Sequence, residues 1–170
     1  MQEHFQMFAR YNQWANRRIY EKAAGLTDAQ YRADCGAFFG SVHRTLNHLL
    51  TTDRIWLNRF TGEGPAYDRL DMVLHEDLPA LRTAREAEDR RIIAWVDTLE
   101  GAKLAATFTY VPITNPREIT QPLAPALAHV FNHQTHHRGQ LHAMLTGLSG
   151  RDAGPVLDLV AFQRESGIGT

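Results

Sequence analysis

Histidine is concentrated in one stretch of this 170-residue chain, where five of the nine histidines lie between His129 and His142. Imidazole is the commonest side-chain ligand of protein-bound transition metals, because it is neutral near pH 7 and offers a free ring nitrogen. Residues four positions apart on a helix lie on the same face. Two pairs have this spacing, His129 with His133 and His133 with His137. The stretch therefore indicates a metal site, and the apolar face of the helix must decide between the pairs.

The apolar face favours the second pair. At about 100° per residue, Val130, Leu141 and Leu148 lie close together on a helix. His137 falls within this stripe and His133 at its border, whereas the other three histidines lie towards the flank or point away. Two inward histidines could instead be buried side chains bonded to backbone or carboxylate. Their spacing in a histidine-dense segment favours metal binding.

The residue after His133 argues against one class of metalloenzyme. Zincin peptidases need a glutamate directly after the first histidine, as general base. Here the residue is Gln134, which cannot take up a proton in that role. A catalytic site usually has three protein ligands and an open position, so a third ligand must come from elsewhere. His43 and His48 are candidates, and periodicity does not choose between them, because His48 lies off the apolar stripe of its segment.

Four long helices are predicted to position these residues, and they suggest an all-α four-helix bundle. Their expected ranges are Glu3–Ala24, Ser41–Phe60, His75–Leu99 and Pro122–Leu148. Ser41 is a plausible N-cap, Gly25 and Gly62 follow expected helix ends, and Pro79 lies in a first turn, where its missing N–H costs little.

Shorter elements are expected outside the four helices. The β-prone pieces TFTYV and REITQ flank a turn-forming ITNP, so a short β-hairpin is predicted between the third and fourth helices. The tail VLDLVAFQRE reads as a short C-terminal helix. Nothing marks a linker, so residues 1–170 are expected to form a single domain.

Composition excludes several partners. The net charge of −1 argues against nucleic-acid binding, which needs a basic surface. No apolar run is long enough to span a membrane, and the N-terminus lacks the apolar core of a signal peptide. A lone cysteine, Cys35, excludes an intramolecular disulfide and fits a reducing compartment. We therefore expect a cytoplasmic protein.

Three stretches resemble the DinB/YfiT-like family of metal-binding four-helix bundles. They are YNQWANRRIY, GSVHRTLNHLLTTDRIWLNRFTGE and HVFNHQTHHRGQLHAML. In that family one histidine of the second helix and two of the fourth bind the metal, and by motif position these are His48, His133 and His137. The resemblance further implies a homodimer and an up-down-down-up order of helices. The hairpin-bearing link between the third and fourth helices fits the crossover that this order requires.

The resemblance also suggests the chemistry. Relatives include transferases and isomerases that use low-molecular-weight thiols such as bacillithiol or mycothiol. A three-histidine site would bind water or a thiol at its open position and lower its pKa. We therefore expect a metal-dependent hydrolase or thiol transferase acting on a small-molecule substrate, with zinc as the first choice of metal and nickel or iron as others. The alternative is a non-catalytic stress-response protein that binds metal or a small ligand.

Several neighbouring residues have two readings, and no catalytic residue is assigned. Asp53 could orient a ligand histidine or pair with an arginine. Arg138 could bind an anionic substrate or thiol, or form an ion pair with a carboxylate. His136 could shuttle protons or face solvent or an interface. Gln140 is a candidate hydrogen-bond partner of a ligand imidazole. Gly139 is disfavoured in mid-helix, which suggests the close approach of another helix.

Overall fold

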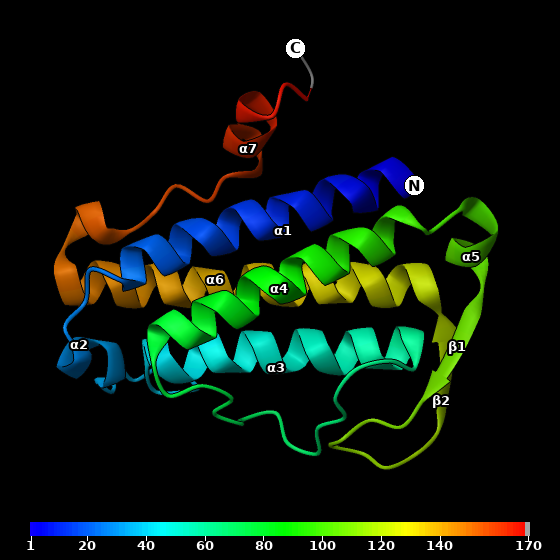
Figure 1. Ribbon diagram of the computed structural model, residues 1–170, viewed down its shortest axis with the longest axis horizontal. Helices are drawn as coiled ribbons and strands as arrows, with labels where there is room; N and C mark the ends of the chain where they lie inside the picture. The colour runs from blue at the N-terminus through cyan, green and yellow to red at the C-terminus, as the bar shows by residue number, and fades with distance from the viewer. Residues whose placement is uncertain (169–170) are drawn as a thin grey trace.

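Four long helices lie side by side in the computed structural model, which describes residues 1–168 (Figure 1). They are α1 (Gln2–Ala23), α3 (Val42–Thr61), α4 (Leu78–Asp97) and α6 (Leu123–Ser149). α1 packs against α4 and α6, and α3 packs against the same two helices on the other side. The four predicted helices and the mainly helical fold class are confirmed, with ends displaced by no more than about three residues.

Six short elements complete the fold. An antiparallel hairpin of β1 (Thr107–Tyr110) and β2 (Ile119–Pro122) pairs Thr107 with Pro122 and Tyr110 with Ile119, as the sequence predicted. The predicted C-terminal helix is α7 (Leu159–Glu165). The sequence did not predict α2 (Asp28–Arg32), α5 (Gly101–Ala105) or the 3-10 helix η1 (Arg151–Ala153), which are too short to show a periodic pattern.

The helices run up-down-down-up, but the crossover is not where we expected it. Figure 1 shows α1 and α6 running in one direction and α3 and α4 in the other. The segment 62–77 must therefore return along the length of the bundle between the parallel helices α3 and α4. The hairpin-bearing link joins the antiparallel helices α4 and α6 at one end of the bundle, so its assignment as the crossover was wrong. Both links are long, and sequence length alone did not distinguish them.

Local signals explain the ends of the two central helices. Ser41 is the N-cap of α3, and its side chain accepts a hydrogen bond from the backbone N–H of Arg44 at 3.2 Å. Gly62 ends α3 in the left-handed conformation at φ 73°, which costs glycine little. Asp77 caps α4 by accepting from the N–H of Ala80 at 2.8 Å. Asp77 is a typical N-cap residue, so this signal in the sequence predicts a helix that begins at Leu78 rather than at His75.

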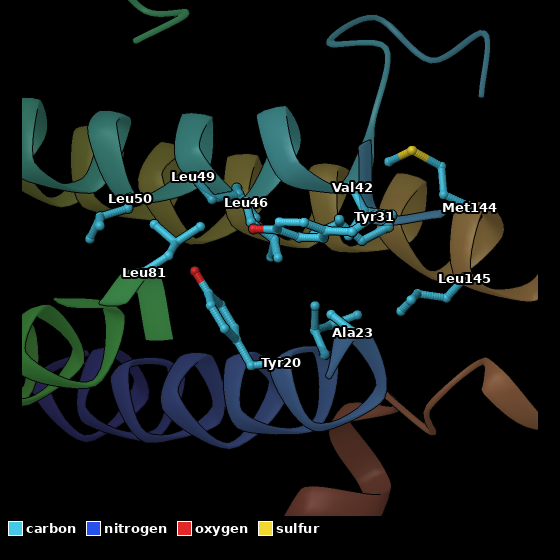
Figure 2. Close-up of a cluster of buried hydrophobic side chains, with 12 residues drawn as sticks. Tyr20, Ala23, Tyr31, Val42, Leu46, Leu49, Leu50, Leu81, Met144 and Leu145 are labelled. Carbon is cyan, nitrogen blue, oxygen red and sulfur yellow. The ribbon is translucent and has the colours of Figure 1, made fainter. Parts of the chain in front are cut away.

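Two apolar clusters fill the two ends of the bundle. The cluster at the α2 end is drawn in Figure 2, and it gathers side chains from α1, α3, α4 and α6 around Leu46, Leu50 and Leu81. The cluster at the hairpin end includes Ile92 and Leu127. Between the two lies a layer of buried polar side chains, to which each long helix contributes. The core is therefore interrupted at mid-height, beside the predicted metal ligands.

No helix within residues 1–168 is both long and apolar enough to cross a membrane.

We expect Leu50→Ala to lower the free energy of unfolding by about 2–5 kcal/mol, because it opens a cavity beneath a fully buried side chain. Urea denaturation followed by circular dichroism measures the change. Val160→Ala serves as the control, since that side chain is 50% exposed and its truncation should change stability by no more than about 0.5 kcal/mol. Equal losses in the two variants would contradict the described core.

Candidate metal centre

The structure brings the three predicted ligands together at the interface of α3 and α6. Ring nitrogens of His48, His133 and His137 all lie within 4.8 Å of one another. The Nε2 atom of His133 lies 3.3 Å from Nε2 of His48 and 3.1 Å from Nε2 of His137. His48 is 3% exposed and His137 7%, whereas His133 is only partly buried. The cluster therefore reaches the surface beside His133.

Two of the three imidazoles are anchored from behind. The carbonyl of Leu70, in the crossover segment, accepts a hydrogen bond from Nδ1 of His48 at 2.7 Å. Oε1 of Gln140 accepts one from Nδ1 of His137 at 2.7 Å. An acceptor at Nδ1 holds the ring proton there, so Nε2 of a neutral ring carries a lone pair directed at the cluster. The predicted role of Gln140 as partner of a ligand imidazole agrees with this contact.

Burial keeps the three rings neutral near pH 7. Desolvation lowers the pKa of His48 from 6.5 to about 4, against a smaller raising effect of the Leu70 carbonyl. Desolvation, followed by the neighbouring histidines, lowers the pKa of His133 to about 3. The pKa of His137 is also lowered by burial, although Gln140 opposes the shift. Neutral imidazole is the form that binds metal.

The arrangement fits a divalent cation. Nε2 of His48 and Nε2 of His137 each direct a lone pair at Nε2 of His133. His133 can carry only one proton on Nε2, so it can donate to only one of these two neighbours, and the other lone pair has no donor within the cluster. A cation satisfies all three. A tetrahedral zinc ion with nitrogen ligands at about 2.0–2.1 Å places those nitrogens about 3.4 Å apart. The observed separations of 3.1 and 3.3 Å are close to that value.

An aromatic side chain closes one side of the cluster. Phe39 stacks on the His48 ring, with centroids 3.8 Å apart and planes 25° apart, and lies 5.5 Å from the His137 ring. It belongs to the segment before α3, where the amide of Gly40 donates to the carbonyl of Ala37. Phe39 therefore shields the buried imidazoles from water on that side. No pattern in the sequence pointed to Phe39, because loop residues have no periodicity.

The other candidate ligands lie outside the cluster. His43 is buried elsewhere on α3, with Nε2 3.2 Å from the carbonyl of His75. His129 is exposed, and its ring lies 5.2 Å from the ring of Trp56. His136 is also exposed, and its Nε2 accepts from Nε2 of Gln140 at 3.3 Å. His136 therefore lies directly beside the cluster: its ring packs edge-on against that of His137, with centroids 4.8 Å apart, and its Nε2 meets the side chain that anchors His137.

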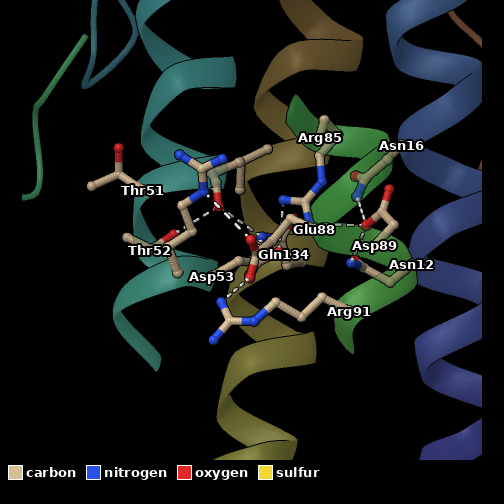
Figure 3. Close-up of polar contacts among 12 residues, drawn as sticks. Asn12, Asn16, Thr51, Thr52, Asp53, Arg85, Glu88, Asp89, Arg91 and Gln134 are labelled. Atoms are coloured by element: carbon tan, nitrogen blue, oxygen red, sulfur yellow. Dashed lines mark hydrogen bonds and ion pairs between the residues drawn. The ribbon is translucent and has the colours of Figure 1, made fainter. Parts of the chain in front are cut away.

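Asp53 pairs with an arginine and does not touch a histidine. Nη1 of Arg85 on α4 donates to Oδ2 of Asp53 at 2.8 Å, and Nη2 of Arg85 lies 2.9 Å from Oδ1 of Asp89 (Figure 3). All three side chains are at most 3% exposed. Burial raises the pKa of Asp53 to about 6, and Arg85 opposes the shift. Burial alone would lower the pKa of Arg85, but Asp89 and Asp53 raise it above its ordinary value.

Gln134 on α6 connects this ion pair to α6, so it joins the two helices, α3 and α6, that carry the candidate metal ligands. Its Nε2 donates to Oδ1 of Asp53 at 2.5 Å (Figure 3). The same nitrogen donates to the carbonyl of Leu49 at 3.2 Å. Gln134 directly follows the candidate ligand His133, and Leu49 directly follows the candidate ligand His48. These two bonds therefore fix α3 against α6 at the level of the cluster. In the sequence Gln134 stands out only as a residue that cannot act as a general base, so this structural role was not predicted.

Arg138 is part of the interior rather than of an open site. Its guanidinium is 2% exposed and donates to side-chain oxygens of Asn12 and Asn16 on α1. Asn16 in turn donates to Asp89 at 3.0 Å. Neither expected role holds: Arg138 is too buried to meet a substrate, and its partners are amide and hydroxyl oxygens rather than a carboxylate. It joins α6 to α1.

Two sequence expectations fail for identifiable reasons. A Cβ at Gly139 would meet no neighbouring atom within 4 Å, so this glycine does not mark a close helix contact. Charged side chains usually face solvent, and the many arginines and glutamates of the third helix suggest the same, yet Arg85, Glu88 and Asp89 are buried. These three residues lie four, seven and eight positions after Leu81 and therefore on the same face of the helix as that buried side chain. Charged residues within an apolar face are a signal in the sequence that could have identified them as buried.

We expect the metal-free protein to lose stability as the pH falls from about 6.5 to about 4. The folded-state pKa values of His48 and His133, about 4 and about 3, lie below the ordinary value of 6.5. Across this range the unfolded chain protonates these two histidines and the folded chain does not, so their contribution favours unfolding at each step towards acid. The raised pKa of Asp53 acts in the opposite direction and offsets part of this loss. Urea denaturation at a series of pH values measures the slope.

The double variant His48→Gln, His133→Gln should show a shallower pH dependence, whereas His142→Gln, at an exposed position of α6, should keep the wild-type slope. Equal slopes in the wild type and the double variant would contradict the burial of neutral imidazoles.

Gln134→Leu should lower the free energy of unfolding by about 1–3 kcal/mol, because it removes a donor from the buried carboxylate of Asp53 and from the carbonyl of Leu49. Chemical denaturation at pH 7 tests this. The same exchange at the half-buried Gln13 of α1 is the matched control and should have little effect. A Gln134→Leu variant as stable as the control would show that this contact does not hold the helices.

Comparison with known proteins finds relatives of this chain. The chain is 28% identical over 150 residues to "Protein DinB" of Bacillus subtilis (strain 168), covering 79% of this chain and 80% of that one. No solved structure matches. The model of the DinB family matches residues 1–162, which is nearly the whole chain. The chain therefore belongs to the DinB family.

Proposed function

We propose that the protein is a metal-dependent enzyme in which His48, His133 and His137 hold a divalent ion, with zinc as the first choice and nickel or iron as others. The observation that carries this proposal is the convergence of three neutral imidazoles whose Nε2 atoms face one another at 3.1–3.3 Å around His133. Structural zinc sites usually have four protein ligands, whereas three ligands leave a position for a reactant.

The chemistry follows from the open position. A bound divalent ion supplies a Lewis acid that lowers the pKa of a water or thiol beside it. Leu70 and Gln140 hold the rings of His48 and His137 with Nε2 towards the cluster, and Phe39 excludes water from one side. A reactant must therefore enter on the side where His133 reaches the surface.

Thiol transfer to a small electrophile is the reaction we favour over hydrolysis. Hydrolysis usually needs a general base to take a proton from water. In the described part of the chain, no carboxylate forms a hydrogen bond or ion pair with His48, His133 or His137. A thiol ionises more readily than water and can attack without such a base. The reaction forms a sulfur–carbon bond and releases the thiol proton and a leaving group.

The alternative is a protein that binds a metal or small ligand without turnover. The low exposure of His48 and His137 and the Phe39 ring above them favour this reading, because they restrict access. Under either reading we propose a homodimer and a small-molecule ligand.

The wild type, expressed with zinc and dialysed, should retain roughly one ion per chain in elemental analysis, as three imidazoles require. His137→Ala should retain less than roughly a tenth of that amount, because two ligands bind far more weakly. His142→Ala on the same helix is the control and should bind as the wild type does. An ion content near zero in all proteins, even after reconstitution, would contradict the metal centre.

The same three proteins test whether the metal centre is catalytic or only binds a metal or small ligand. Conjugation of bacillithiol or mycothiol to an electrophilic substrate should proceed faster with the wild type and His142→Ala than with His137→Ala. Equal rates in all three, with metal bound to the wild type, would favour the non-catalytic alternative.

A further inference from the structure

Arg59 is a half-buried cation without a hydrogen-bonding partner near the proposed metal centre. It lies in the last turns of α3, and its guanidinium sits 4.7 Å from the ring centroid of Trp56 and 4.6 Å from that of Tyr110 on β1. These aromatic faces interact with the flat face of the guanidinium. The N–H groups on its edge need acceptors instead, and within residues 1–168 none is in hydrogen-bond or ion-pair contact with them.

Other arginines of α3 and α4 show what is missing at Arg59. Arg54 pairs with Glu88, Arg82 pairs with Glu86, and Arg85 pairs with both Asp53 and Asp89. Burial lowers the pKa of Arg59, and the hydroxyl of Tyr110 opposes the shift. A guanidinium stays charged in proteins, so Arg59 is a partly desolvated positive charge that lacks its counter-ion.

The position of Arg59 connects it to the metal centre. Trp56 contacts Arg59 on one side and the ring of His129 on the other, at 5.2 Å. The His129 ring lies 6.0 Å from that of the ligand His133. On α3, His48, Trp56 and Arg59 share one face, and Arg59 lies about 16 Å along the axis from His48. Helical side chains lean towards the N-terminus, so Arg59 leans towards the metal ligands.

The charge at this position suits a carboxylate. Arg59 supplies one positive charge beside Trp56 and Tyr110, and its N–H groups are unpaired within residues 1–168. The planar edge of its guanidinium matches the two oxygens of a carboxylate, and a phosphate dianion would usually meet more than one cation.

We propose that Arg59 binds a carboxylate of the thiol or substrate whose reacting group sits at the three histidines. This inference rests on the proposed metal function and adds a ligand class to it, namely small molecules with a carboxylate remote from the reacting atom. Trp56 and Tyr110 hold the guanidinium with its edge free, so Arg59 is a specificity determinant and takes no part in bond making.

Cobalt-substituted protein provides a readout that does not depend on activity. Thiols that bind cobalt produce a thiolate charge-transfer absorption, which yields a dissociation constant for each thiol. We would titrate a series of mercaptocarboxylates and the mercaptoalcohols of equal length. The wild type should bind the carboxylate of the best length about tenfold more tightly than the matching alcohol, as expected for a charge-assisted contact.

Variants test whether Arg59 causes this preference. In Arg59→Gln the preference should disappear, with dissociation constants of acid and alcohol within about twofold of each other. Arg59→Lys keeps the charge but loses the planar fork, so it should retain part of the preference. Arg90→Gln on α4 removes the same charge at an exposed position in the groove between α1 and α4, and should behave as the wild type.

The outcomes separate the inference from the function on which it rests. If cobalt, or every thiol, fails to bind the wild type, the metal-thiol function is overturned and the inference with it. If cobalt and thiols bind but Arg59→Gln keeps the wild-type preference, only the inference is overturned. Should Arg59→Gln fail to fold, an undiminished preference in Arg59→Lys would overturn it, and a reduced one would support it.

Discussion

The bundle depends on one buried cation that is shared by two carboxylates at mid-height. Arg85 on α4 pairs with Asp53 on α3 and with Asp89 one turn along its own helix, and none of the three is more than 3% exposed. Charges removed from water are costly, so they persist only where partners satisfy them. Asn12, Asn16 and Gln134 supply those further contacts from α1 and α6. A displacement of any of the four helices along its axis would remove an ion pair or a hydrogen bond from a buried charged group, so this layer sets their register.

The register set by the polar layer is also the register of the candidate metal centre. Gln134 and Arg138 on α6 belong to the layer, and each directly follows a proposed ligand, His133 and His137. On adjacent positions of a helix, side chains point about 100° apart, so one residue faces the bundle axis and its neighbour faces the α3–α6 flank. The contacts that satisfy the buried carboxylates thereby hold the imidazoles at their separation. The same two turns of α6 therefore carry both the residues that stabilise the bundle, Gln134 and Arg138, and the candidate metal ligands, His133 and His137.

The site is asymmetric in a way that suits a reactant entering from one side. Phe39 and the crossover carbonyl of Leu70 enclose His48, and Gln140 restrains His137, whereas His133 reaches the surface. Buried neutral imidazoles keep their lone pairs free of protons near pH 7, and burial also lowers the local dielectric constant, which strengthens their interaction with a cation. From His133 a line of aromatic contacts through His129 and Trp56 leads to the cation of Arg59.

Sequence alone determined the features that depend on neighbours along the chain. Helical periodicity and caps such as Ser41 located the four long helices, the turn-forming ITNP located the hairpin, and the apolar stripe selected His133 and His137.

Only the tertiary structure decided which side chains meet across helices. His48 lies off the main apolar stripe of α3, and the family resemblance pointed to it where periodicity could not, because α3 buries one face in the core and another beneath the crossover segment. The partner of Asp53, the interior role of Arg138 and the place of the crossover were undetermined for the same reason. Each depends on how whole helices are rotated and ordered about one another, and the spacing of residues within a single helix does not fix that arrangement.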